Sequence, residues 1–134
     1  MDPSAEYDPR YLAGIRCFNR RDFFEAHEVW EAVWRDCPRE WHLFYKGLIQ
    51  AAVALYHWSK GNWSGSRRLF LSGRTYMSAY PDVALGLDVA RFWKEMEMAL
   101  ADVLRESPPP ETARLDERRV PTIVISNVPS EFFR

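Results

Sequence analysis

The sequence has few of the residues that mark secreted, metal-binding or nucleic-acid-binding proteins. Its 134 residues include 2 cysteines and 3 histidines, and the formal net charge is −1. Two cysteines without a CxxC pair do not make a disulfide framework. A balanced charge leaves no basic field that would hold nucleic acid or an anionic membrane. We therefore expect no nucleic-acid partner, no membrane partner, no metal and no other cofactor.

Long hydrophobic runs are also missing, and we expect no secretory leader. The most apolar stretch, GLIQAAVALY, is too short to span a bilayer. The N-terminal MDPSAEYDPRY has no basic segment followed by an apolar run. Cys17 and Cys37 lie in helical patterns beside bulky apolar residues, so we interpret them as small hydrophobes and not as nucleophiles. Together these features predict a cytoplasmic protein with reduced thiols.

Apolar residues recur at helical spacing over most of the chain. They make up 47% of the sequence, and aromatic residues 15%, which is ample for the core of one domain. Capping residues, prolines and glycines mark the ends of the periodic segments. We predict an all-α fold, a compact bundle of five helices. Their expected ranges are residues 8–19, 22–37, 38–60, 62–79 and 82–105.

A faint internal repeat suggests how these helices are arranged. The segments DFFEAHEVW and NWSGSRRLF begin 40 residues apart, at Asp22 and Asn62. Both begin with a residue suited to an N-cap, and Trp30 in the first segment matches Phe70 in the second. We infer two stacked helical hairpins closed by the fifth helix.

The C-terminal part of the chain differs from the rest. Three consecutive prolines in SPPPE end the last helix, since proline cannot continue it. We therefore divide the chain into a helical domain, residues 1–107, and a proline-rich linker with an extended tail, residues 108–134. The apolar run VPTIVI must be buried somewhere. We expect the tail to dock on its own chain, and a homodimer that exchanges tails is the alternative.

Polar residues interrupt the aromatic face of the second helix. At about 100° per residue, His27 and Glu31 lie one turn apart among the aromatic residues, whereas Glu25 and Glu28 lie nearer to solvent. A carboxylate at this spacing orients an imidazole and favours its charged form. The second helix therefore offers an acid–base pair within an otherwise apolar surface.

The third helix has a similar interruption. Gln50 and His57 are the polar residues of an apolar stretch and share one stripe. Because a buried polar group without a partner costs about 1–3 kcal/mol, we expect them to join His27 and Glu31 in one buried cluster, reached by Arg67 or Arg74. On this basis Glu31→Ala should cost about 2–4 kcal/mol, and Glu25→Ala about 1 kcal/mol at most.

Two long segments carry a family resemblance. YLAGIRCFNRRDFFEAHEVWEAVWR and FYKGLIQAAVALYHWSKGNWSGSRRL resemble the all-helical family known as domain of unknown function 309. The family's phrases are FFEAHExWE, GLIQxAxAxxH and a GN…G segment. They match Glu25, His27, Glu28, Glu31, Gln50, His57, Gly61, Asn62 and Gly65. The chain departs from the family at Arg21, Asp22 and Ser66, outside the polar set. The resemblance implies a compact helical fold and no known activity.

The motifs favour a non-catalytic helical module that binds a small molecule or a protein. HEVWE lacks the second histidine of the zinc motif HExxH, and no serine lies in a GxSxG elbow. Trp41, Phe44 and Tyr45 would mark the partner surface if they are exposed.

The alternative is a small hydrolase-like enzyme, with or without a metal, that uses His27, Glu28, Glu31 and His57. In it, Glu31 would orient His27, and His27 or Glu28 would act as the base.

Overall fold

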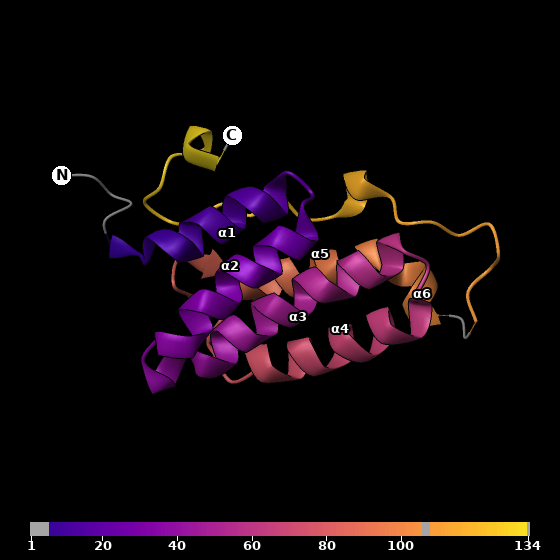
Figure 1. The fold of residues 1–134 in the computed structure, drawn as a ribbon, viewed down its shortest axis with the longest axis horizontal. Coiled ribbons are helices and arrows are strands. Elements are labelled where there is room, and N and C mark those ends of the chain that lie inside the picture. Colours follow the sequence, from indigo (N-terminus) through magenta and orange to yellow (C-terminus); the bar gives the residue numbers. More distant parts are fainter. Residues whose placement is uncertain (1–5, 106–107, 134) are drawn as a thin grey trace.

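Helices make up almost all of the regular structure, as the sequence predicts (Figure 1). The structure is a computed structural model, and it describes residues 6–105 and 108–133. Its α-helices are α1 (Pro9–Asn19), α2 (Phe23–Asp36), α3 (His42–Ser59), α4 (Trp63–Met77), α5 (Val89–Ala99) and α6 (Ala101–Arg105). The shorter elements are the strands β1 (Val83–Ala84) and β2 (Leu87–Asp88) and the 3-10 helices η2 (Arg39–Trp41), η3 (Glu117–Arg119) and η4 (Ser130–Phe133).

The helices α1 to α4 lie side by side in chain order, each packed against the next, and α5 lies behind them (Figure 1). The apolar α3 is the central element. It approaches α4 closely because glycines meet at the contact: a Cβ atom added to Gly47 would lie 3.1 Å from the carbonyl oxygen of Gly73. In the part of the chain that the structure describes, no helix is both long and apolar enough to cross a membrane.

The repeat between α2 and α4 is present in the structure. The Asp22 carboxylate caps α2 by accepting from the Glu25 N–H at 3.4 Å, and the Asn62 side chain caps α4 by accepting from the Gly65 N–H at 3.0 Å. Trp30 and Phe70, the matched aromatic residues, are both fully buried. The two helices therefore use equivalent caps and equivalent core positions.

The predicted fifth helix is wrong over its first part. Residues 83–88 form a two-stranded antiparallel hairpin, and α5 begins only after Asp88, whose side chain accepts from the Arg91 N–H at 3.0 Å. The two loop residues, Leu85 and Gly86, have φ angles of 48° and 73°. Two consecutive positive φ angles match the twist of a tight hairpin. Leucine seldom adopts this conformation, so the sequence carried little signal for the turn.

Two other helix ends also differ from the prediction. Residues 39–41 form η2, and α3 therefore begins at His42 and not at Pro38. At the far end of the predicted fifth helix, Leu100 separates α5 from the short α6. The expected domain boundary at residue 107 lies outside the described residues.

The C-terminal tail lies against α1 of its own chain and runs back along it (Figure 1). The Asn19 side chain accepts from the Ile123 N–H at 2.8 Å and donates to the Ile123 carbonyl oxygen at 2.9 Å, as a neighbouring strand would. The Arg16 guanidinium donates to the Phe132 carbonyl oxygen at 2.8 Å. The tail docks in cis and completes the core with its buried residues, Val120, Ile123, Ile125, Val128 and Phe133.

Trp30 lies at the centre of the contact between α1 and α2. Its side chain is 0% exposed, and its indole N–H donates to the Tyr11 carbonyl oxygen at 3.1 Å. The indole fits against α1 only because residue 14 is glycine. A Cβ atom at Gly14 would lie 2.1 Å from Trp30 Nε1, which is a severe overlap.

Candidate functional site

His27 lies on α2 between Phe24 and Glu31, as the helical spacing predicts. One ring nitrogen, Nδ1, contacts the Phe24 carbonyl oxygen, and the other, Nε2, lies 3.8 Å from Glu31 Oε1. A carbonyl oxygen can only accept a hydrogen bond, so Nδ1 carries the hydrogen. The pair with Glu31 becomes an ion pair only when the ring is protonated.

The acidic residues of α2 are more exposed than a buried cluster would require. Glu25 and Glu28 are exposed, as predicted. The Glu31 side chain, expected to be buried, is 38% exposed and lies 3.7 Å from the Arg35 guanidinium one turn further on. Glu31 therefore belongs to a chain of charges at the surface of α2.

The polar residues of α3 find partners on the side of α4. Gln50 Oε1 accepts a short hydrogen bond from the Ser72 hydroxyl of α4. The His57 ring contacts the Asn62 side chain at 3.4 Å, in the turn that leads into α4. Both residues are half-buried. They are satisfied locally, as polar groups of a helical interface usually are.

Arg67 and Arg74, the arginines expected to reach the cluster, are not gathered around His27 and His57. Arg74 pairs with Glu97 of α5, with 3.6 Å between the side chains. Arg67 is half-buried and forms no hydrogen bond or ion pair with other residues of the described ranges. Within residues 6–105 and 108–133, the polar residues expected in one cluster thus form separate local pairs. The single hydrogen-bonded cluster expected from the sequence is not formed.

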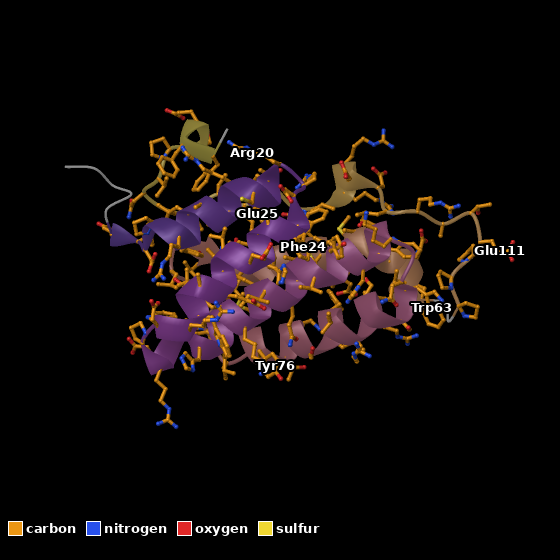
Figure 2. The ribbon with its side chains drawn as sticks, in the orientation of Figure 1. Arg20, Phe24, Glu25, Trp63, Tyr76 and Glu111 are labelled. Carbon is orange, nitrogen blue, oxygen red and sulfur yellow. The ribbon has the colours of Figure 1, made fainter. Side chains whose placement is uncertain are left out.

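Aromatic rings connect the two histidines instead. The centroid of the Phe24 ring lies 4.9 Å from that of His27 on α2 and 5.4 Å from that of Tyr56 on α3. The Tyr56 ring in turn lies 6.3 Å from that of His57. These four rings, Phe24, His27, Tyr56 and His57, form a continuous surface across α2 and α3, which we call the ring face. Figure 2 labels Phe24, near the middle of the view.

The sequence singled out neither Tyr56 nor Phe24 of this face, and of the two Phe24 is the exposed residue. Its side chain is 48% exposed. The only available signal was its place on the helical wheel, at the edge of the apolar face beside Glu28. The aromatic residues proposed as a partner surface behave differently: Phe44 and Tyr45 are buried, and Trp41 stacks on Tyr80. That prediction is wrong for Phe44 and Tyr45, because both point from α3 into the core.

The chemistry available to the histidines is limited by their neighbours. Neither His27 nor His57 is hydrogen-bonded to a hydroxyl or thiol group of a described residue. A nucleophile activated by a histidine base needs such a contact. Across the described ranges, no group of three or more His, Cys, Asp or Glu side chains is placed to hold a metal ion. The arrangement presents rings and charges to solvent without pairing a base with a nucleophile.

Glu31→Ala is expected to lower the free energy of unfolding by only about 0.5 kcal/mol, because its carboxylate is 38% exposed and lies as far as 3.7 Å from the exposed Arg35 guanidinium and 3.8 Å from His27 Nε2. This replaces the larger loss expected from the sequence. Urea denaturation of Glu31→Ala and Glu25→Ala side by side checks it. If Glu31→Ala lowers the free energy of unfolding by more than about 2 kcal/mol beyond the loss for Glu25→Ala, the result would instead support the buried cluster.

Comparison with known proteins places this region in a family. The model of the family described as Domain of unknown function (DUF309) matches residues 11–69, which run from α1 into α4. This confirms the resemblance, and residues 11–69 belong to the family.

Two relatives extend the similarity beyond this segment. The "Uncharacterized protein YpuF" of Bacillus subtilis (strain 168) is 38% identical over 100 residues, which are 72% of this chain and 55% of the relative. An "Uncharacterized protein" of Aquifex aeolicus (strain VF5) is 30% identical over 93 residues, which are 69% of this chain and 28% of the relative. The chain thus spans about half of the first relative and less of the second.

Proposed function

We propose that the protein is a non-catalytic interaction module that binds a protein partner through the ring face. The observation that carries the proposal is the exposed ring of Phe24, held between the half-buried rings of His27 and Tyr56. Aromatic residues are enriched at the centres of protein interfaces, where covering them removes apolar surface from water. A side chain with partly buried neighbours is already oriented, so binding it costs little conformational entropy.

The charges around the ring face indicate the chemistry of its partner. Glu25 and Glu28 are exposed on the same helix, and Glu31 is partly exposed. Two cations accompany them: Lys60, with Nζ 5.6 Å from the centroid of the Tyr56 ring, and Arg35, which lies 3.7 Å from Glu31. Because acidic side chains predominate, we expect a partner surface that combines an apolar anchor with basic residues.

The acid and base residues of the alternative lie outside four hollows of the described surface. Enzyme sites are concave and enclose their substrates. Four hollows on the described residues are lined by other side chains, and none of the four contains His27, Glu28, Glu31 or His57. The proposed module needs no cofactor. We place it in the cytoplasm, where free thiols such as those of Cys17 and Cys37 stay reduced.

Site-specific crosslinking tests the proposal and captures the partner in the same experiment. A photoreactive benzoylphenylalanine at position 24 should crosslink in cells to one discrete protein, because the ring lies at the expected interface. The matched control carries the same group in place of Leu71, an exposed residue of α4 with 42% exposure. A product that forms at position 24 and not at position 71 supports the ring face. Identical products at both positions, or none at position 24, would refute it.

A further inference from the structure

A separate pocket of about 230 Å³ lies where the start of α1 meets the end of α2 and the start of α3. Its aromatic walls come from Tyr7, Tyr11, Trp41 and Tyr45. The Tyr11 ring stands edge-on to the Tyr45 ring, with 5.7 Å between centroids. We call this hollow the N-terminal pocket. It shares no residue with the ring face.

Tyr45 lines this pocket, and its hydroxyl group has no partner among the described residues. The side chain is 4% exposed, and its hydroxyl forms no hydrogen bond with any described residue. The other two tyrosine hydroxyls are occupied: Tyr7 donates to the Ser126 carbonyl oxygen at 2.8 Å, and Tyr11 donates to the Leu85 carbonyl oxygen at 3.0 Å. Burial raises the pKa of Tyr45, so the phenol stays neutral. Its oxygen can accept a hydrogen bond from a bound group.

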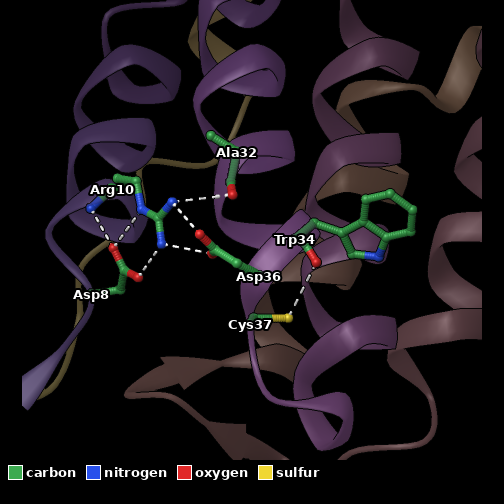
Figure 3. A network of polar contacts seen from close by, with 6 residues as sticks. All are labelled: Asp8, Arg10, Ala32, Trp34, Asp36 and Cys37. Carbon is green, nitrogen blue, oxygen red and sulfur yellow. Dashed lines mark hydrogen bonds and ion pairs between the residues drawn. The ribbon is translucent and has the colours of Figure 1, made fainter.

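The pocket carries negative charge that its neighbouring cation does not cancel. Asp8, Asp36 and Glu6 all line it. The Arg10 guanidinium holds Asp8 and Asp36 in place, as Figure 3 shows, and its hydrogen bonds lower the pKa of both carboxyls. All five N–H groups of this guanidinium are used, four on the two aspartates and one on the Ala32 carbonyl oxygen. Arg10 therefore offers no donor to an anion, and three carboxylates face one cation.

These features of the N-terminal pocket favour an organic cation as its ligand. Carboxylates and aromatic faces both attract a positive charge. No set of three metal ligands is formed in the described part of the chain. An ammonium group has N–H donors that suit the unpartnered Tyr45 hydroxyl, and an alkyl stem suits the aromatic walls.

We propose that the N-terminal pocket binds a primary alkylammonium group, with its N–H donating to Tyr45 Oη and its charge balanced by Asp8 and Asp36. The methylene stem lies among the rings of Tyr7, Tyr11 and Trp41. A free small amine and a lysine side chain of another protein share this chemistry.

Titration of the full chain with butylammonium chloride, followed by amide and indole NMR signals, tests the proposal. Saturable shifts should be confined to the residues around the pocket, with a dissociation constant of about 1 mM or below, within reach of so small a ligand. Butan-1-ol, a neutral molecule of the same length, should bind at least about tenfold more weakly. Nα-acetyl-lysine-N-methylamide distinguishes a free amine from a lysine side chain as the ligand. It should bind as well as butylammonium only if the pocket accepts a lysine side chain.

Two variants and one control complete the test. Tyr45→Phe removes only the hydroxyl and should weaken butylammonium binding about fivefold. Asp36→Asn removes one charge from an exposed position and should weaken it about threefold to tenfold. Glu97→Gln makes the same charge change on α5, away from the pocket, and should leave binding unchanged. Equal binding of butylammonium and butan-1-ol, or unchanged binding in both folded pocket variants, would overturn the proposal.

Discussion

Trp30→Ala should lower the free energy of unfolding by about 3–5 kcal/mol. Trp30 is fully buried between α1 and α2, and its ring contacts that of Phe18 with 5.9 Å between centroids. Removing the indole leaves a cavity and also removes the hydrogen bond that its N–H donates to the Tyr11 carbonyl oxygen. Urea denaturation measures the change. A loss below about 1 kcal/mol would mean that the α1–α2 contact does not depend on this residue.

Gly14, which faces Trp30 across this contact, provides a sharper test. Gly14→Ala should destabilise the protein by about 1–3 kcal/mol, because the added methyl group overlaps the indole. In a chain that already carries Trp30→Ala, the same change should be neutral or stabilising, since alanine favours a helix over glycine by about 1 kcal/mol. The double-mutant cycle isolates the overlap. Strictly additive effects would contradict the close approach of α1 to Trp30.

Deleting residues 121–134 should cost at least about 3 kcal/mol of unfolding free energy, because several apolar side chains of the tail lie in the core. Their removal also exposes the α1 surface that they cover. Asn19→Ala tests the same docking with one residue, and should cost about 1–3 kcal/mol by leaving the backbone groups of Ile123 unpaired.

The control for the tail lies within the tail itself. Val124 is 54% exposed, between the buried Ile123 and Ile125. Val124→Ser should therefore change the unfolding free energy by no more than about 0.5 kcal/mol. A truncated chain with unchanged stability, or with the same loss as Val124→Ser, would show that the tail contributes nothing to the fold. A change of mass in sedimentation equilibrium would instead indicate tails exchanged between two chains.

The order of the helices and their caps could be predicted because the signals are local. Asp22 and Asn62 both begin helices at the expected residues, and the matched core positions Trp30 and Phe70 are both buried. The hairpin at residues 83–88 could not be predicted in the same way. Its turn depends on Leu85 in a conformation that leucine rarely adopts, and the packing of α5 and the tail around the turn has no local signal.

The candidate site, too, could be predicted only where its signals are local. Helical spacing correctly places His27 beside Glu31, because both lie on one helix. Spacing also places Gln50 and His57 on one stripe of α3, but it does not say which neighbouring helix this stripe faces. The central α3 contacts both α2 and α4, and Gln50 pairs with Ser72 of α4. The contact between Phe24 and Tyr56 depends on the packing of α2 against α3, which no single-helix pattern contains.

The most direct test of the ring face is an affinity measurement by calorimetry, between the protein and the partner that crosslinks at position 24. Phe24→Ala should weaken binding at least about tenfold, as expected for an aromatic residue at the centre of an interface. Its unfolding free energy should change little, since the ring is half exposed. Leu71→Ala, the matched change on α4, should leave the affinity within about twofold of the unchanged protein. Equal affinities for the unchanged protein and Phe24→Ala would contradict the assignment of the ring face as the binding surface.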